Sequence, residues 1–393
     1  IKLSQRVQAV KPSPTLAITA RAAELRAAGK DVIGLGAGEP DFDTPEHIKE
    51  AAIQAIHEGK TKYTPVDGTA ELKQAVIDKF RRDNGHDYAA EQILVSCGGK
   101  QSFYNLAQAL LDPGEEVIIP APYWVSYPDM TILAGGIPVY IRAGAAQQFK
   151  ITPEQLAAAI TDKTRLLVLN SPSNPTGMAY TRAELEALGE VLRQYPNILV
   201  ATDDMYEHIL WSDEPFCNIL MACPDLYDQT MVLNGVSKAY SMTGWRIGYA
   251  GGPADIIKSM KKIQSQSTSN PTSISQAAAV AALNGPQDAI GTMLKAFRER
   301  HDYVVERLNG MNGIDCLPTD GTFYVFPNIE GMIEATDGVS NDLEMGEYLI
   351  ENAGVAVVPG SAFGLGGHMR ICIATGRDAL QNALDRIEKV VNG

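Results

Sequence analysis

Ser237-Lys-Ala-Tyr-Ser-Met-Thr-Gly-Trp-Arg246 is the stretch of this 393-residue chain from which the rest can be understood. It follows an apolar run of strand type, Met231 to Leu233, and the turn pair Asn234-Gly235. A lone lysine after a strand usually lies in solvent, but the flanks of Lys238 are rich in Gly, Ser and Trp, which suit close packing around a ligand. Arg246 follows at a spacing that lets it return to the same pocket. A lysine in a partly dry pocket beside another cation can act as an amine nucleophile toward a carbonyl.

A nucleophilic lysine together with an arginine suited to a phosphate is what pyridoxal 5′-phosphate (PLP) requires of a protein. The quoted stretch resembles the lysine signature of class I aminotransferases, which are PLP enzymes of fold type I. The resemblance covers nearly the whole chain. It is closest to the bacterial aspartate aminotransferases, which read Ala-Gly-Glu-Pro-Asp-Phe near their start (residues 37–42 here) and Gly-Gly-Lys before their first long helix (residues 98–100 here). It implies that Lys238 forms a Schiff base with PLP and that Ser237 and Arg246 also bind the cofactor.

Composition restricts the possible partners. The net charge is −14 and no block of basic residues is present, so we expect no nucleic-acid or membrane partner. Five widely spaced cysteines without a CxxC pair favour reduced thiols and a cytoplasmic location. No HExxH or other metal-spaced set occurs among the six histidines, so we expect no metal. With 45% hydrophobic residues, the chain is typical of a globular enzyme large enough for two domains.

The middle of the chain alternates short apolar strands with helices. Strands are predicted at 93–96, 117–119, 138–141, 166–169, 198–201 and 231–233, with another apolar run after Arg246. Capping boxes at Thr152-Pro-Glu-Gln155 and Thr181-Arg-Ala-Glu184 begin two of the intervening helices. This α/β pattern predicts a mostly parallel sheet covered by helices on both faces. The resemblance implies seven strands, in a large PLP-binding domain that we place at residues 48–290.

The pattern changes after about Gly285. A long helix is predicted at 291–309, followed by strands near 322–325, 355–358 and 368–374 and a helix near 342–352. We interpret this as a smaller α/β domain onto which the N-terminal segment folds back. The predicted small domain therefore comprises residues 1–47 and 291–393.

One strand and the helix after it predict a phosphate site. Residues 93–96 read as a strand, and Cys97-Gly-Gly-Lys-Gln101 then opens a helix. A helix N-terminus offers free N–H groups and a favourable dipole to an anion. The motif is weak alone, but Lys238 and Arg246 already indicate a phosphate. We therefore expect Gly99 and Lys100 in the cofactor site.

Polar and aromatic residues follow three other strands. Trp124 could be a core residue or could stack on a flat ring. Asn170-Ser-Pro-Ser-Asn174-Pro-Thr-Gly177 would ordinarily be a turn, and Asp203 and Asp204 would ordinarily be polar loop residues. The resemblance implies instead that Asn174 contacts the cofactor ring and the substrate. It implies that Trp124 also contacts both the cofactor and the substrate. It also implies that Asp203 is the partner of the pyridine nitrogen, and that Tyr206 donates to the 3-oxygen of the ring.

Three residues lie outside this central region. The glycines near Gly38 do not have the spacing of a dinucleotide loop, and Pro40 prevents a helix from starting there, so a turn beside a small ligand fits better. The resemblance implies that the Gly38 amide binds the substrate carboxylate. Tyr63 could cover a hydrophobic edge, but the resemblance implies that it reaches the cofactor phosphate of a partner subunit in a homodimer with shared active sites. Arg370, in an apolar strand, must be paired or bind an anion, and we favour a clamp on a substrate carboxylate.

The resemblance implies ping-pong transfer of the amino group of L-aspartate to 2-oxoglutarate, giving oxaloacetate and L-glutamate. One branch of the family binds the distal carboxylate with a partner arginine, but Gln264-Ser-Gln-Ser267 contains none, so this role is carried over to Lys100. An aminotransferase for aromatic amino acids, prephenate or alanine, or a PLP β-lyase, would share the same catalytic residues. A ligand sensor of a transcription regulator would need a basic DNA-binding segment, which residues 1–30 lack.

Overall fold

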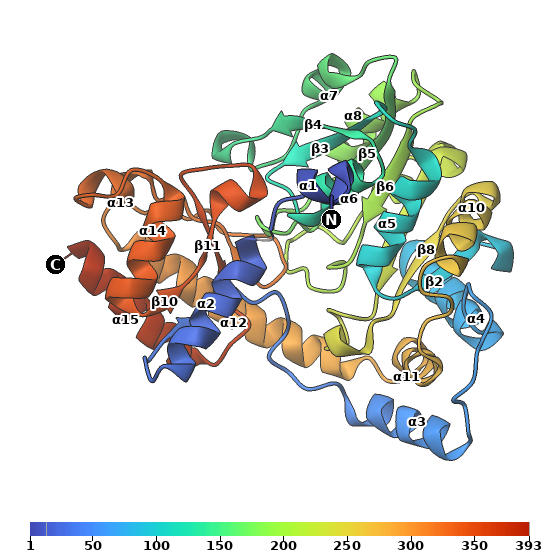
Figure 1. Cartoon of the computed structure of the whole chain (residues 1–393), viewed down its shortest axis with the longest axis horizontal. Coiled ribbons are helices and arrows are strands. Elements are labelled where there is room, and N and C mark those ends of the chain that lie inside the picture. The colour runs from blue at the N-terminus through green and yellow to red at the C-terminus, as the bar shows by residue number, and fades with distance from the viewer. Residues whose placement is uncertain (13, 393) are drawn as a thin grey trace.

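A seven-stranded sheet forms the centre of the larger part of the molecule (Figure 1). The computed structural model describes residues 1–12 and 14–392. In sheet order the strands are β2 (Ile93–Ser96), β8 (Gly248–Gly251), β7 (Thr230–Gly235), β6 (Leu199–Asp203), β5 (Thr164–Asn170), β3 (Glu116–Ala121) and β4 (Ile137–Arg142). β8 runs antiparallel to both of its neighbours, and the pairs from β7 to β4 are parallel. The predicted mostly parallel seven-stranded sheet is confirmed.

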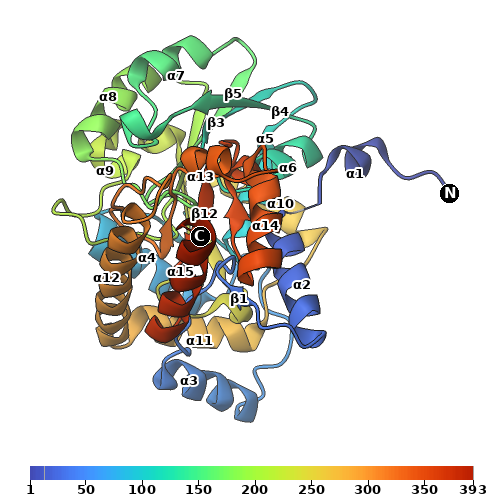
Figure 2. The ribbon, with the colours of Figure 1, turned by 90° about the vertical axis from the view of Figure 1, so that its left-hand side faces the viewer.

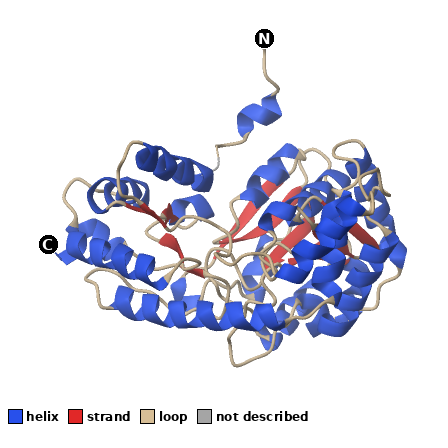
Figure 3. Ribbon diagram, turned by 90° about the horizontal axis from the view of Figure 1, so that it is seen from below, coloured by secondary structure: helices blue, strands red, loops and turns tan. Residues whose placement is uncertain are grey.

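Both faces of the sheet are covered because successive side chains of a strand point to opposite faces. In β5, Leu166 and Val168 pack in one core with α5 (Gly99–Leu110), whereas Leu167 and Leu169 pack in another with α8 (Arg182–Leu192). Figure 3 shows the strands enclosed between helices. The other helices of this part are α3 (Glu46–His57), α4 (Ala70–Lys79), α6 (Ser126–Leu133), α7 (Pro153–Ala159), α9 (Ile219–Ala222), α10 (Ala254–Ser265) and α11 (Ser273–Asn284). Both capping boxes form, and they begin α7 and α8.

Strand β7 is longer than the sequence predicts. Asn234-Gly235 is not a turn, because these residues continue the strand and pair with Tyr249 and Gly248 of β8. The Asn234 side chain is buried and donates to Glu207 Oε1 at 2.8 Å, so its polar group is satisfied inside the fold. A side chain at Gly235 would lie 3.0 Å from the Ile247 carbonyl oxygen, so glycine permits the close strand pairing here.

The C-terminal segment, from α12 onward, forms the second, smaller part, on the left in Figure 1. It contains α12 (Asp288–Asn309), α13 (Glu330–Ala335), α14 (Asp342–Tyr348), α15 (Arg377–Asn392) and a three-stranded sheet in the order β11 (Val358–Pro359), β12 (Met369–Cys372), β9 (Tyr324–Val325). β1 (Ile33–Gly34) pairs with β10 (Val355–Ala356), and α2 (Pro14–Ala27) lies beside them, so the N-terminal segment does fold back here.

The strand predicted at 355–358 is two strands, β10 and β11, which belong to different sheets. The partner of β10 comes from the distant N-terminal segment, so the local pattern of apolar residues could not show where one strand ends.

Within the described residues, no helix is both long and apolar enough to span a bilayer.

The predicted domain limits, after residues 47 and 290, fall inside α3 and α12. Residues of α3 such as Ile48 and Ala52 pack in one core with α11 of the large part. By contrast, Phe297 and Val304 of α12 belong to the core of the small part. We therefore propose that the first limit lies before α3, whereas the second lies near the start of α12.

Candidate active site

The predicted site residues meet because of the directions of the strands. Parallel strands place their carboxyl ends at one edge of a sheet, and ligands of such sheets bind there. Because β8 is reversed, its first residues lie at the same edge, which brings the preceding Arg246 to the ends of β2 and β7.

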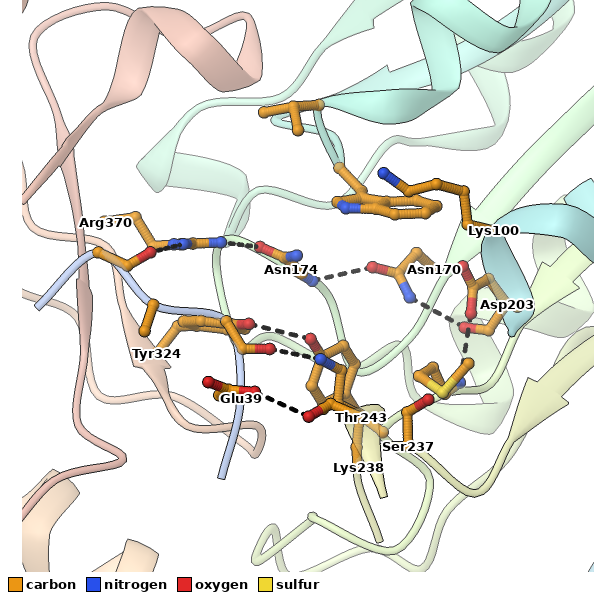
Figure 4. Close-up of a pocket in the computed structure, with 18 of the residues that line it drawn as sticks. Glu39, Lys100, Asn170, Asn174, Asp203, Ser237, Lys238, Thr243, Tyr324 and Arg370 are labelled. Atoms are coloured by element: carbon orange, nitrogen blue, oxygen red, sulfur yellow. Dashed lines mark hydrogen bonds between the residues drawn. The ribbon is translucent and has the colours of Figure 1, made fainter. Parts of the chain in front are cut away.

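A cavity of about 400 Å³ lies at this edge, between the two parts of the molecule (Figure 4). The predicted residues in its wall are Gly38, Gly99, Lys100, Trp124, Asn174, Asp203, Tyr206, Ser237, Lys238, Arg246 and Arg370. Tyr63 does not line it, and its side chain is 92% exposed. The expected role of Tyr63 across a subunit interface stays a prediction.

The Lys238 amine lies in the wall of the cavity. Its Nζ donates to the carbonyl oxygen of Gly38 and lies 6.0 Å from the ring of Tyr206 and 5.8 Å from that of Phe323. Burial, and then the charge of Arg370, lower the pKa of Lys238 to about 8. Arg370 rather than Arg246 is therefore the cation with the larger effect on this amine. A lysine with this pKa is partly neutral at physiological pH, as a nucleophile or proton carrier must be.

Asp203 and Asp204 point to different surroundings. The Asp203 carboxylate faces the cavity and accepts from the Tyr127 hydroxyl at 2.5 Å and the Met205 amide at 3.3 Å. Burial raises its pKa, while the hydrogen bond from Tyr127 acts in the opposite direction. Asp204 is fully buried and accepts from Thr202 and Asn218, both at 2.6 Å. Only Asp203 of this pair can therefore meet a ligand in the cavity.

Arg370 is held in place from several sides. It is 3% exposed, and its guanidinium donates to Asn174 Oδ1 at 2.9 Å and to the Gly36 carbonyl oxygen at 2.7 Å. The guanidinium carbon lies 4.4 Å from the ring centre of Tyr324. The Nε atom is buried and has no hydrogen-bond partner among the described residues. A buried, unpaired donor on a fixed guanidinium is suited to an anionic ligand, such as a carboxylate.

The N-terminus of α5 and Arg246 form one end of the cavity. The first N–H groups of this 12-residue helix have no acceptor within the helix. Gly98 precedes it with a φ of 89°, and a side chain at Gly98 would collide with the Arg246 guanidinium. That guanidinium donates to the carbonyl oxygens of Thr243 at 2.8 Å and Cys97 at 3.3 Å. This end has the donors and the positive charge that bind a phosphate.

Lys100 and Arg370 lie on opposite sides of the cavity (Figure 4). The Lys100 ammonium is 5.1 Å from the ring centre of Trp124, within the range of a cation–π contact. Burial, and then Arg246, lower the pKa of Lys100. The cavity therefore presents one cation to each end of a ligand that lies between them.

Several residues of the site were not predicted. Tyr127, Asn170, Thr243 and Tyr324 contact predicted residues, and Glu39 accepts from Thr243 Oγ1 at 2.7 Å. Asn170 and Glu39 stood inside motifs that the sequence analysis quoted, so a closer reading could have found them. Tyr127 and Tyr324 occupy positions that the sequence pattern shows only as buried aromatics.

The residues of the cavity fit PLP. The α5 N-terminus with Arg246 suits its phosphate, the anchored carboxylate of Asp203 suits a protonated ring nitrogen, and the Lys238 amine suits its aldehyde. The cavity thus carries a group suited to the phosphate, the ring nitrogen and the aldehyde of the cofactor, and the Tyr206 hydroxyl in its wall suits the ring hydroxyl.

Comparison with known proteins agrees with this geometry. A family model described as aminotransferase class I and II matches residues 30–387. The chain is 60% identical to an aspartate/prephenate aminotransferase of Nitrosomonas europaea, over the whole of both chains. It is 51% identical to an aspartate aminotransferase of Geobacillus stearothermophilus, over 99% of this chain and 98% of that one. The crystal structure of the aspartate aminotransferase from Rhizobium meliloti is similar, with a TM-score of 0.96 and 49% identity over 100% of this chain and 99% of that one.

Proposed function

Since the chain belongs to the class I and II aminotransferase family, we propose that this PLP-dependent enzyme transfers the amino group of L-aspartate to 2-oxoglutarate. The observation that carries the choice of substrate is the pair of cations, Arg370 and Lys100, on opposite sides of the Lys238 cavity. A dicarboxylic amino acid has one carboxylate for each of them. The relatives from Nitrosomonas europaea and Geobacillus stearothermophilus, whose names both include aspartate, also support it.

In the proposed mechanism, each residue has one task. When bound, PLP supplies a conjugated ring that takes up the electron pair left on the substrate carbon when a proton is removed. Arg370 and the Gly38 amide bind the α-carboxylate, and Asn174 orients Arg370 through their hydrogen bond. The Lys238 amine would remove the proton from the substrate Cα and hold it for its return, as the general base and acid of the site. With PLP bound, Asp203 would hold the proton on the ring nitrogen, and Tyr206 would donate a hydrogen bond to the ring oxygen.

The proposal can be tested by the visible absorbance of the PLP-loaded protein before and after L-aspartate is added without a keto acid. We expect a visible band that aspartate converts to that of the amino form of the cofactor, and 2-oxoglutarate to restore it. This half-reaction behaviour is the signature of ping-pong kinetics. No band after reconstitution would disprove the role of Lys238. A band that responds only to alanine would disprove the dicarboxylate assignment.

Prephenate is a second candidate for the amino acceptor. Two relatives are named aspartate/prephenate aminotransferases, at 60% and 55% identity. Prephenate also carries two carboxylates, so the same pair of cations suits it. A comparison of kcat/KM for 2-oxoglutarate, prephenate and phenylpyruvate would decide which acceptor the enzyme prefers.

Replacing Lys100 with methionine should weaken dicarboxylic substrates selectively. We expect kcat/KM for aspartate to fall about 10-fold or more, because a charge-assisted hydrogen bond is lost, while kcat/KM for alanine changes little. Steady-state kinetics with both amino acids measure the difference, with the exposed Lys163→Met as a control for loss of a positive charge. Equal losses for aspartate and alanine would contradict the assignment.

The rate at which the cofactor-free protein captures PLP should depend on the pKa of Lys238. Only the neutral amine attacks a carbonyl, and the pKa of Lys238 is lowered to about 8 from 10.5. We therefore expect the capture rate to rise about tenfold per pH unit below pH 8 and to level off above it. Stopped-flow absorbance between pH 6 and pH 10 measures this, with free lysine as the reference. A rate that still rises at pH 10 would show an ordinary amine.

We also propose a homodimer with shared active sites. Apolar side chains that a single chain leaves in water support it: Tyr63 is 92% exposed, and Ile53 and Ile56 of α3 are 53% and 52% exposed. The N-terminal end of the chain, with helix α1 (Gln5–Ala9), extends away from the body of the chain (Figure 2), and Leu3 and Val7 are exposed. A cytoplasmic location stays a prediction that rests on the cysteine pattern.

Sedimentation equilibrium should give twice the mass of one chain. If Tyr63 reaches the phosphate of the partner site, Tyr63→Ala should keep the dimer but retain PLP about 10-fold less tightly, as expected for one hydrogen bond to a charged group. A monomeric wild-type protein with full activity would contradict shared sites.

A further inference from the structure

One buried tyrosine contacts both the carboxylate-binding arginine and the tyrosine of the cofactor pocket. Tyr324 belongs to β9 of the small part, its side chain is 0% exposed, and it lines the cavity. Its hydroxyl lies 3.1 Å from that of Tyr206, and its ring lies against the Arg370 guanidinium at 4.4 Å (Figure 4). A side chain at Gly38 would lie 3.1 Å from the same hydroxyl. The position of Tyr324 is therefore closely defined.

The two hydroxyls can form a chain of hydrogen bonds. A phenol has one O–H donor and can also accept, so Tyr206 can accept from Tyr324 while it donates to a ligand oxygen in the cavity. Burial raises the pKa of Tyr206 well above its usual range and that of Tyr324 to about 12, so both phenols keep their protons at neutral pH. A hydroxyl that accepts a hydrogen bond becomes a stronger donor.

The ring of Tyr324 has a separate role. The carbon of the Arg370 guanidinium lies 4.4 Å from the ring centre of Tyr324 and 5.1 Å from that of Phe363. Aromatic faces attract a guanidinium and limit its rotation. Since the hydroxyl reaches Tyr206 and the ring reaches Arg370, the same side chain restrains both groups.

We propose that Tyr324 is a positioning residue that strengthens the hydrogen bond from Tyr206 to the cofactor through its hydroxyl and orients Arg370 toward the substrate carboxylate through its ring. This inference rests on the roles of Tyr206 and Arg370 in the proposed function. It extends them to a residue that touches both and couples the cofactor side of the cavity to its substrate side.

Two substitutions separate the two contacts. Tyr324→Phe removes the hydroxyl and keeps the ring, so we expect the KM for aspartate to stay within about twofold of the wild-type value. Tyr324→Leu removes both, so the KM for aspartate and that for alanine should both rise about 3- to 10-fold, as expected for the loss of one cation–π contact. Both substrates carry the α-carboxylate that Arg370 would bind.

The hydroxyl is tested by the pH dependence of the visible spectrum of the PLP-loaded protein without substrate. A hydrogen bond to the 3-oxygen of the ring favours the form in which this oxygen is negative and the neighbouring nitrogen has lost its proton. Its weakening should therefore raise the midpoint pH of the spectral change. We expect an increase of about 0.5 for Tyr324→Phe and of about 1 or more for Tyr206→Phe.

The double variant provides the decisive comparison. If Tyr324 acts through Tyr206, adding Tyr324→Phe to Tyr206→Phe should not raise the midpoint further. Tyr88→Phe is a matched control, because the Tyr88 hydroxyl is buried without a hydrogen-bond partner among the described residues, and it should leave the midpoint unchanged.

The outcomes distinguish a failure of this inference from a failure of the proposed function on which it rests. A wild-type protein that gives no visible band with PLP would overturn the proposed function. A normal wild-type titration that Tyr324→Phe does not alter, or alters equally in the presence and absence of the Tyr206 hydroxyl, would overturn the inference alone. A KM that Tyr324→Leu leaves unchanged would overturn the part that concerns Arg370.

Discussion

Replacing Lys238 with alanine should lower kcat/KM for transamination by about 10⁴-fold or more, because both the attachment point of the cofactor and the general base are lost. The Lys238 amine is the group in the cavity whose pKa, at about 8, suits proton transfer near neutral pH. The other lysine in the wall, Lys100, faces Trp124 and cannot take its place. Single-turnover measurements with PLP-loaded protein and aspartate would quantify the loss.

Chemical rescue distinguishes the loss of the Lys238 amine from a failure of the variant to fold. A small primary amine such as methylamine fits into the space that the deleted side chain leaves, so it should restore part of the activity of Lys238→Ala in proportion to its concentration. The exposed Lys163→Ala serves as the control and should behave like the wild type. Activity within tenfold of the wild type in Lys238→Ala would remove this residue from the mechanism.

Replacing Asp203 with asparagine should lower the rate of the half-reaction with L-aspartate by about 10³-fold. This is the size of effect seen when a preorganised electrostatic group is removed from an active site. Asparagine keeps the shape but not the negative charge that holds a proton on the ring nitrogen. Cofactor binding should change much less, because the α5 N-terminus and Arg246, which form the proposed phosphate site, are untouched.

Equilibrium dialysis measures the affinity for PLP, and stopped-flow absorbance measures the rate of the half-reaction. The matched control is Asp228→Asn, an exposed acid outside the cavity. If Asp203→Asn lost cofactor affinity and rate to the same extent, the carboxylate would serve to bind the cofactor rather than to hold its charge.

Much of this arrangement could be predicted from sequence because most of the predicted groups in the large part lie at or just after the end of a strand. The apolar runs identify the strands, and their parallel order brings Lys238, Asp203 and Asn174 to one edge. The periodicity could not show that β8 is reversed or that residues 355–358 divide between two sheets, since both depend on distant partners.

Sequence reasoning also missed the residues that support the site. Tyr127 and Tyr324 are buried aromatics, and nothing in their local pattern shows that their hydroxyls reach Asp203 and Tyr206. Asp203 and Asp204 are adjacent residues of the same type, so the local sequence pattern does not distinguish them. They differ because successive residues at the end of β6 point in opposite directions, one to the cavity and one to Asn218.

The way in which the two parts of the molecule share the cavity has a consequence for directed evolution. The groups proposed for the phosphate, the ring nitrogen and the aldehyde all follow strands of the large sheet or precede β8, whereas Arg370, Tyr324 and Gly38 come from the small part and the segment that folds back onto it. A mutant library confined to β12 and the N-terminal segment would therefore vary the substrate side of the cavity and leave the residues proposed to bind the cofactor unmutated.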